Sequence, residues 1–363
     1  MILVDGYEIG PVSTGVGRVI HNLIMELSSV TPYEFMVVSR REISEYRSKP
    51  NIHSRVIPYA GGYFWWQNRI MMREIKKGGW GLFIGPNYTL PLWFRGRAVL
   101  LEHDISFVAH PGWFSRKEAI KRKFLVGRSL KKSTLVMTVS HFSRREILRY
   151  FPVDPGKVHV VYHGVDRQFH PAENSEIRKW KDSKGFRDEK VIGFLGSIFN
   201  RRHIPLLVQA VAKLRDRIPA SLHIVGKDLT CPAQNVEGLL DRPWIRWEQS
   251  LPDEQLPVFY SALDAFAYLS EYEGFGLPPL EALACGTLPV LLNRTALAEI
   301  YPDIAVMVDD VNAEEVKGAL WSALTDAGMR KNKMDSFQKQ RHMFTWKRAA
   351  GEWAAHMEAL LRS

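Results

Sequence analysis

Two glutamates eight residues apart are the residues of this chain most suited to chemistry. Glu273 and Glu281 lie in the segment YLSEYEGFGLPPLEALACGTLPV, residues 268 to 290. The glycines between them allow a sharp backbone path, and the proline pair that follows suits the first position of a helix. Gly286 suits the end of that helix, because glycine often follows the last turn. The unpaired N–H groups at the helix start would attract an anion such as a phosphate.

The two carboxylates are expected to serve different parts of one ligand. Glu281 is expected in the first helical turn, where an acidic side chain can accept hydrogen bonds from ribose hydroxyls. Glu273 precedes the turn, on the other side of the anion. Four residues between them would shape the anion site: Gly274, Phe275, Gly276 and Leu277. This pattern favours a diphosphate with a polyol at each end, which describes a nucleotide-sugar.

The segment E-G-F-G-L-P-P-L-E-A-L-A-C-G-T-L-P-V resembles the E-x7-E hallmark of the retaining GT-B glycosyltransferases of family 4. The resemblance implies an α/β fold of GT-B architecture, in which two Rossmann-like, doubly wound parallel-sheet domains face each other across a cleft. It also implies that the C-terminal domain binds the donor. An ordinary loop and helix with surface glutamates would explain the spacing alone, so the other segments of the family pattern matter.

Two segments of the first half also resemble the family. Thr14-Gly-Val-Gly-Arg is similar to the glycine loop that approaches the donor diphosphate and the acceptor, which implies donor contacts for Gly15 and Gly17. L-E-H-D-I-S-F is similar to the H-D-x-S-F segment, whose histidine lies beside the transferred sugar. His103 also follows an apolar run, at a strand end where α/β sheets place ligands. We therefore expect His103 to be catalytic.

One segment of the second half resembles the family's phosphate-contacting loop. The apolar run 191–195 leads into G-S-I-F-N-R-R-H-I-P-L-L, which is similar to a glycine, a variable loop and a basic pair ahead of a helix. Arg202 stands where a lysine is usual, and arginine can hold a phosphate through two bonds. Ser197 stands where many members carry arginine. Both residues are expected to contact the donor.

The length of the chain indicates two domains. It has 363 residues, and a typical domain has about 150 residues. Strand-like runs alternate with helical stretches, which predicts parallel sheets covered on both faces. We expect an acceptor-side domain over 1–165, a linker over 166–189 and a nucleotide-sugar-binding domain over 190–344. The amphipathic helix 345–363 is expected to join the first domain, as the resemblance implies.

The expected elements are spread over both halves of the chain. The strands are residues 1–4, 34–38, 98–101, 135–139, 158–161, 191–195, 222–225, 265–269, 288–292 and 305–308. The helices include residues 16–27, 118–130, 205–214, 254–261 and 314–324. Ser115-x-x-Glu118 and Ser143-x-x-Glu146 have the spacing of capping boxes, so each serine is expected to cap a helix.

Cysteine content and the N-terminus bear on location. Cys231 and Cys285 lack metal-ligand spacing, which argues for a reducing compartment and against a disulfide scaffold. The start MILVDGYEIG lacks a basic region and a long apolar core, and no run approaches membrane-spanning length. We expect a cytoplasmic protein that can associate peripherally with the inner face of the membrane.

Positive charge is concentrated in the first half. Residues 1–165 hold 24 lysines and arginines against 12 acids, whereas residues 166–363 hold 25 against 27. A basic half favours an anionic partner, although solvated helix faces explain it equally well. Residues 63–77 interleave large apolar and basic groups, as an interfacial helix or a core helix with a charged outer face would. The expected partners are a glycan or lipid-linked acceptor and an anionic membrane surface, and no nucleic-acid motif is present.

The predicted reaction is metal-independent glycosyl transfer with retention of configuration. No Asp-x-Asp triplet or metal-ligand spacing occurs in the sequence, so no metal and no cofactor are expected. A mannosyl or glucosyl unit would move from a GDP- or UDP-linked donor to an acceptor in cell-envelope glycan synthesis. Glu273 would hold the sugar and help stabilise its cationic centre. The alternatives are a nucleotide-sugar 2-epimerase and a non-catalytic basic protein that binds membrane or nucleic acid.

Overall fold

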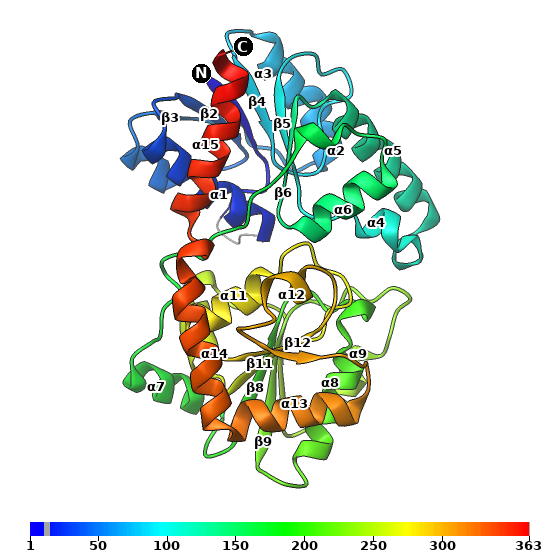
Figure 1. Ribbon diagram of the computed structural model, residues 1–363, viewed down its shortest axis with the longest axis vertical. Coiled ribbons are helices and arrows are strands. Elements are labelled where there is room, and N and C mark those ends of the chain that lie inside the picture. Colours follow the sequence, from blue (N-terminus) through cyan, green and yellow to red (C-terminus); the bar gives the residue numbers. More distant parts are fainter. Residues whose placement is uncertain (11–14, 363) are drawn as a thin grey trace. The chain divides into compact units, whose positions relative to one another are not determined.

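The computed structural model describes residues 1–10 and 15–362, which divide into two units. The first comprises Met1–Gly164 and Met343–Ser363, and the second comprises Val165–His342. Each unit is built on one sheet of parallel strands with helices on both faces (Figure 1). This confirms the expected α/β class with two parallel-sheet domains. The expectation that the domains face each other across a cleft stays a prediction.

The first unit contains a seven-stranded sheet in the order β3-β2-β1-β4-β5-β6-β7. The strands are β1 (Ile2–Gly6), β2 (Phe35–Ser39), β3 (Ile52–Val56), β4 (Leu82–Gly85), β5 (Ala98–Glu102), β6 (Leu135–Thr138) and β7 (Val158–Val160). Every neighbouring pair is parallel, with Val4 opposite Val37 and Leu100 opposite Val136. Parallel pairs need helical crossovers, and these cover the two faces of the sheet.

Seven α-helices belong to the described part of the first unit. They are α1 (Gly15–Val30), α2 (Tyr63–Trp65), α3 (Met72–Lys76), α4 (Ser106–Ala109), α5 (Arg116–Lys132), α6 (His141–Tyr150) and α15 (Trp346–Arg362). A π-helical stretch, Trp66–Met71, joins α2 to α3. The C-terminal α15 packs along α1, and it buries Trp346 and Trp353, which lie two turns apart on one face.

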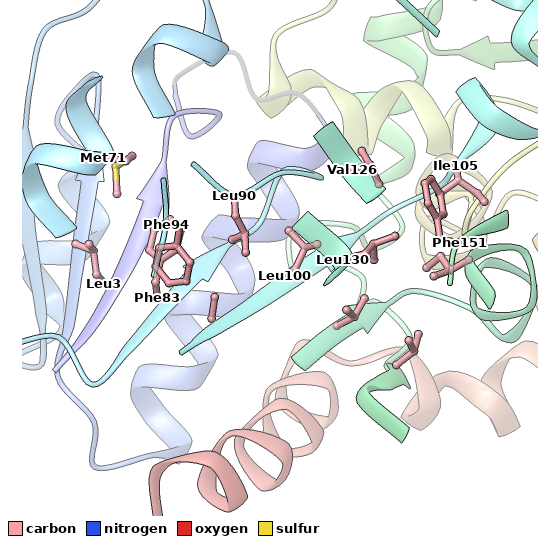
Figure 2. Close-up of a cluster of buried hydrophobic side chains, with 14 of the residues drawn as sticks. Leu3, Met71, Phe83, Leu90, Phe94, Leu100, Ile105, Val126, Leu130 and Phe151 are labelled. Carbon is pink, nitrogen blue, oxygen red and sulfur yellow. The ribbon is translucent and has the colours of Figure 1, made fainter. Parts of the chain in front are cut away.

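The apolar core of the first unit lies between its sheet and the covering helices. Figure 2 shows Leu100 of β5 near Leu130 of α5, with Phe83 of β4 beside Phe94. All four side chains are at most 4% exposed. Burying such a side chain contributes about 1.5–3 kcal/mol, so this core holds the strand ends in place.

The second unit contains a six-stranded sheet in the order β10-β9-β8-β11-β12-β13. Its strands are β8 (Lys190–Leu195), β9 (Ala220–Val225), β10 (Ile245–Glu248), β11 (Ala265–Tyr268), β12 (Pro289–Leu292) and β13 (Val306–Val308). Its helices are α7 (Asn174–Lys184), α8 (Ile204–Leu214), α9 (Val236–Leu240), α10 (Leu256–Ser261), α11 (Leu277–Ala284), α12 (Thr295–Ile300), α13 (Ala313–Thr325) and α14 (Ala327–Gln340). The strand order is that of a doubly wound sheet.

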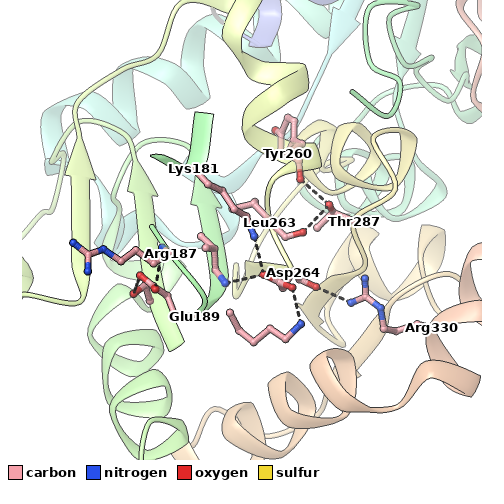
Figure 3. Close-up of polar contacts among 11 residues, drawn as sticks. Lys181, Arg187, Glu189, Tyr260, Leu263, Asp264, Thr287 and Arg330 are labelled. Atoms are coloured by element: carbon pink, nitrogen blue, oxygen red, sulfur yellow. Dashed lines mark hydrogen bonds and ion pairs between the residues drawn. The ribbon is translucent and has the colours of Figure 1, made fainter. Parts of the chain in front are cut away.

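A polar cluster ties together the amino ends of β8 and β11 (Figure 3). Asp264, just before β11, accepts hydrogen bonds from the backbone N–H of Val191 at 2.9 Å and from Lys190 Nζ at 3.0 Å. Lys181 Nζ lies 3.4 Å from the same carboxylate, and Arg330 donates to the Asp264 carbonyl at 2.7 Å. We call these five residues the Asp264 cluster, and its contacts hold two strands and two helices together.

All ten expected strands are confirmed, and three strands were missed. Two of these, β3 and β10, are edge strands whose mixed sequences IHSRV and IRWE expose charged side chains to solvent. Edge strands tolerate exposed charged side chains because they pair with a neighbouring strand on one side only. The third, β4, is buried and central but only four residues long. Such a short apolar run is weak evidence for a strand by itself.

One of the two expected helix caps is confirmed. The Ser115 hydroxyl accepts from the backbone N–H of Glu118 at the start of α5. The second prediction was wrong by one turn, because α6 is capped by Ser140, whose hydroxyl accepts from the Ser143 N–H at 3.0 Å. Both serines have the right chemistry for a cap, and the end of strand β6 decides which one is used.

The expected linker, residues 166–189, differs from the observed structure. It contains α7, whose N-terminus carries a reciprocal capping box between Glu173 and Glu176. Trp180 of this helix is 7% exposed and packs on Phe259 of α10. The stretch is polar because its outer face is solvated, which explains why composition alone indicated a linker. Over residues 1–10 and 15–362, no helix combines the length and apolar character needed to cross a membrane.

Candidate functional site

The carboxyl ends of β8 and β11 form the switch point of the second sheet. β8 has β9 on one side and β11 on the other, so the winding of the chain reverses between β8 and β11. Doubly wound sheets bind their ligands outside the carboxyl ends of strands at this point. The turn after β8 carries Ser197 and Arg202, and the turn after β11 carries Glu273. The topology therefore joins two segments that are distant in the sequence.

The side chain of Glu273 is bound by one residue from the turn after β8 and by the last residue of β11. Its Oε1 accepts from Nη2 of Arg202 at 3.1 Å and from the Tyr268 hydroxyl at 2.9 Å. Arg202 Nη1 donates to the Ser197 carbonyl at 2.9 Å, and its guanidinium lies 5.0 Å from the Tyr268 ring centroid. The side chains of Arg202 and Glu273 are 12% and 17% exposed. We call Arg202, Tyr268 and Glu273 the Glu273 cluster.

Electrostatics keeps the donors of this cluster protonated. Burial acts to lower the pKa of Arg202, but Tyr268 and the Glu273 carboxylate outweigh it and raise the pKa. Burial raises the pKa of the Tyr268 hydroxyl far above neutrality. Arg202 also has a buried Nε with no hydrogen-bond partner among residues 1–10 and 15–362. The cluster therefore retains an N–H group that could bind an anion.

The backbone around Glu273 is held by α12. The N–H of Glu273 donates to Thr295 Oγ1 at 3.2 Å, and Thr295 has a φ of 54°. Positive φ is a strained conformation for a β-branched residue, and such strain concentrates at functional sites. Gly276 has a φ of 92°, and a Cβ there would lie 2.7 Å from Leu297 Cδ2. The turn therefore requires glycine, and the Tyr301 hydroxyl donates to the Gly276 carbonyl at 2.5 Å.

The helix that follows this turn starts one residue earlier than expected. Leu277 is the first residue of α11 and Pro278 the second, so neither proline occupies the first position. Gly286, with a φ of 88°, follows the helix end as predicted. The first N–H groups of a helix have no partner within it, and here they lie beside Gly276 at the switch point. This end of α11 is suited to an anion.

The structure corrects the position of Glu281. Because α11 begins at Leu277, Glu281 is its fifth residue and lies in the second turn instead of the first. Glu281 is 3% exposed, and its Oε2 accepts from the hydroxyl of buried Tyr260 at 2.7 Å. It is therefore held inside the second unit, close to the switch point. Its predicted contact with a ribose stays a prediction.

His103 follows β5 in the first unit, at the carboxyl edge of that sheet. Its Nε2 donates to the Pro86 carbonyl at 3.0 Å, which leaves Nδ1 with the lone pair. Burial lowers the pKa of His103, so the ring is neutral at pH 7. The His163 ring centroid lies 5.9 Å away. The neighbouring Asp104 accepts from the Ser106 N–H through its Oδ1 at 2.8 Å.

Gly15 and Gly17 lie at the start of α1. The helix begins at Gly15, one residue before the expected start at residue 16, so both glycines belong to its first turn. Thr14, the first residue of the predicted glycine loop, lies outside the described residues. A Cβ at Gly15 would meet nothing within 4 Å, so close packing does not require this glycine. The predicted donor contacts of the two glycines stay predictions.

Sequence reasoning missed three residues that support these side chains. Tyr268 and Thr295 hold Glu273, and Tyr260 holds Glu281. Tyr268 is the last residue of β11 and the first residue of the glutamate segment, and this position was the one available signal. Thr295 and Tyr260 lie on helices that follow or precede the segment, and only tertiary packing brings them to it.

Family models and curated relatives match most of this chain. Residues 176–341 match the family model "Glycosyl transferases group 1", and residues 13–169 match "Glycosyltransferase Family 4". The O-antigen chain mannosyltransferase B of Escherichia coli is 30% identical over 270 residues, which cover 73% of this chain and 71% of that protein. The MMP alpha-(1->4)-mannosyltransferase of Mycolicibacterium hassiacum is 27% identical over 72% of this chain and 63% of its own length.

Solved structures show the same fold at lower sequence identity. Sucrose-phosphate synthase from Thermosynechococcus elongatus aligns with a TM-score of 0.80, at 17% identity and 99% coverage of both chains. Anabaena HepE in complex with UDP and glucose aligns with a TM-score of 0.76, at 16% identity and 99% coverage of both chains. With the family models and the mannosyltransferase relative, they show that this chain is a GT-B glycosyltransferase of the group 1, family 4 type.

Proposed function

We propose that this protein transfers a mannosyl unit, with retention of configuration, from a nucleotide diphosphate sugar to a glycan acceptor in cell-envelope polysaccharide synthesis. Two relatives named as mannosyltransferases support the sugar, and the O-antigen relative supports the class of acceptor. The donor is GDP- or UDP-linked, and UDP in the structurally similar HepE complex supports a nucleotide at this fold. A lipid-linked acceptor would place the reaction at the inner face of the membrane.

The observation that carries this proposal is the Glu273 cluster at the switch point of the second sheet. A carboxylate, an arginine and a helix N-terminus converge there on a glycine turn. The arginine and the helix N-terminus suit the diphosphate, because both are preorganised donors to anionic oxygens. The carboxylate suits hydroxyls of the sugar. The buried Nε of Arg202 adds a donor that no residue of the described chain uses.

The proposed reaction breaks the bond between the anomeric carbon and the donor phosphate oxygen. Negative charge grows on the diphosphate, and Arg202 and the start of α11 stabilise it. Positive charge grows on the sugar, where Glu273 stabilises it. The acceptor hydroxyl attacks from the face that the phosphate leaves, and a phosphate oxygen takes its proton. His103, neutral and fixed by the Pro86 carbonyl, would contact the sugar, while Glu281, Gly15, Gly17 and Ser197 would support the donor.

The test is a thermal-shift panel of GDP-mannose, UDP-glucose, UDP-galactose and the free nucleotides. A bound donor stabilises the fold by about 2.7 kcal/mol at a concentration one hundred times its Kd. The nucleotide-sugar with the largest shift is then incubated with and without a mannose oligosaccharide. Product that appears only with the oligosaccharide supports transfer, and the anomeric configuration of the new bond tests retention. Isomerised donor in the absence of acceptor would identify an epimerase and overturn the proposal.

A further inference from the structure

Four large apolar side chains of the first unit are exposed to solvent. Trp65 is 53% exposed, Trp93 66%, Ile120 62% and Phe124 64%. Leaving side chains of this size in water costs free energy unless something covers them. Scattered exposed apolar residues are ordinary, but a contiguous patch marks an interaction site.

Contacts between the elements that carry these four side chains bring the side chains to one face. Lys121 of α5 lies over the Phe64 ring, 5.0 Å from its centroid, which places α2 and Trp65 beside α5 (Figure 1). Residues 120 and 124 are one turn apart on α5, so their side chains lie on the same face. The loop that carries Trp93 is bonded to the same elements, since the Leu92 N–H donates to Asn68 Oδ1 at 2.8 Å and the Leu92 carbonyl accepts from Arg128.

Positive charge surrounds these apolar side chains. α5 contains eight lysines and arginines and one acid, Glu118, which is ion-paired with Arg122 at 2.6 Å. Lys117, Lys121 and Lys123 are exposed. The Arg69 guanidinium lies 4.8 Å from the centroid of the Trp65 ring. We call Trp65, Trp93, Ile120, Phe124 and the exposed cations of α5 the aromatic–basic face.

We propose that the aromatic–basic face docks on a bilayer surface that carries anionic lipid headgroups. Tryptophan and phenylalanine side chains partition into the headgroup and acyl boundary, while lysine and arginine pair with lipid phosphates. Ile120 and Phe124 in the middle of the cations favour a bilayer over a nucleic acid, because an isoleucine side chain gains nothing from a phosphate backbone. The inference concerns where the enzyme works, and it does not depend on the donor or the sugar.

The test is flotation of the full-length protein with vesicles of phosphatidylcholine alone or mixed with phosphatidylglycerol, at low and high salt. Binding is expected only to the mixed vesicles, and salt should weaken it. Lys117→Glu/Lys121→Glu/Lys123→Glu should weaken binding by roughly a hundredfold, since each cation near an anionic surface contributes about tenfold or less. Trp93→Ser/Phe124→Ser should weaken it by roughly tenfold through lost insertion.

Matched variants in the second unit test whether vesicle binding depends on this face or on the overall charge and hydrophobicity of the protein. Arg178→Glu/Lys179→Glu/Arg187→Glu changes three exposed cations by the same net charge, and Leu229→Ser removes a side chain that is 49% exposed. Both should bind vesicles like the unchanged protein. Equal loss in the charge control, or tighter binding to a short duplex RNA than to the mixed vesicles, would overturn the proposal. Nucleotide-induced thermal shifts of every variant report the donor site separately.

Discussion

Strands β8 and β11 have a carboxylate at each of their two ends. We assign the carboxylate at the amino ends to the stability of the fold and the carboxylate at the carboxyl ends to the candidate site. At the amino ends, Asp264 is bonded to a backbone N–H, two lysines and, through its carbonyl, Arg330 (Figure 3). At the carboxyl ends, Glu273 is bonded to one arginine and one tyrosine. Both are partly buried ion pairs on the same two strands. Counting ion pairs would not distinguish a structural cluster from a site.

The surrounding backbone makes the distinction. Asp264 accepts directly from the first residues of the sheet, and its cations come from α7, α14 and the start of β8. Glu273 lies three residues before a glycine with positive φ, and its N–H bonds a strained threonine near the N-terminus of α11. Helix N-termini concentrate at the carboxyl edge of a parallel sheet, so only that edge offers unpaired donors to an anion. Substitutions at the two ends of these strands test this distinction.

Substitution of Glu273 by glutamine should have the largest effect on activity. The amide oxygen can still accept from Arg202 and Tyr268, but the negative charge that faces the developing cation is lost. We expect kcat to fall by roughly a thousandfold, as for other preorganised electrostatic groups. The free energy of unfolding should change by less than about 1 kcal/mol. Initial rates and urea unfolding measure the two quantities, and an active E273Q enzyme would end the catalytic assignment.

Substitution of Arg202 by alanine should weaken donor binding by roughly a hundredfold, because a charge-assisted contact to the diphosphate is lost. Arg202→Lys should recover part of the affinity, since it keeps the charge but not the planar fork. Arg330→Ala is the matched control from the Asp264 cluster, and it should leave the donor Kd unchanged. Titration calorimetry with nucleotide measures all three. If Arg330→Ala weakened donor binding more than Arg202→Ala, the donor site would have to be assigned to the amino ends of the strands.

Substitution of Asp264 by asparagine should lower the free energy of unfolding by about 2 kcal/mol at pH 7, without changing the kcat of folded enzyme. Burial acts to raise the pKa of Asp264, but the Val191 N–H and the two lysines outweigh it and lower the pKa. The carboxylate therefore stabilises the fold above its unfolded pKa of about 3.9, and this contribution disappears as pH falls through the lower folded value. Urea unfolding from pH 7 to pH 3 should show the difference between wild type and D264N shrinking toward the acid end. A constant difference would show that charge is not responsible.

Substitution of Thr295 by alanine should have the smallest effect. The Glu273 N–H loses its acceptor, so the carboxylate should be held less well and kcat should fall by roughly tenfold, whereas donor binding should change little. Thr295→Ser retains the hydroxyl and should keep nearly full activity. Steady-state kinetics of the two variants measure this split. If serine and alanine behave alike, the hydroxyl does not position Glu273.

Sequence reasoning predicted the strand, turn and helix of the site because local chemistry determines them. Gly276 must adopt a positive φ, and Gly286 must end the helix, whatever the rest of the chain does. The alternation of apolar runs likewise predicted ten of the strands. Edge strands β3 and β10 were not predicted, because their side chains are half solvated and their sequences therefore lack a strong apolar pattern. Helix α7 was not predicted, because its outer face has the composition of a linker.

By itself, the sequence determined which chemistry the glutamate segment could offer and on what kind of turn it lies. Only the tertiary structure decided the partners. Arg202 reaches Glu273 from 71 residues away because parallel pairing sets the ends of β8 and β11 at one edge of the sheet. The same packing buries Glu281 against Tyr260, which its place in the sequence did not indicate. Spacing along the chain specifies a local conformation, whereas contacts between strand ends depend on the order of the whole sheet.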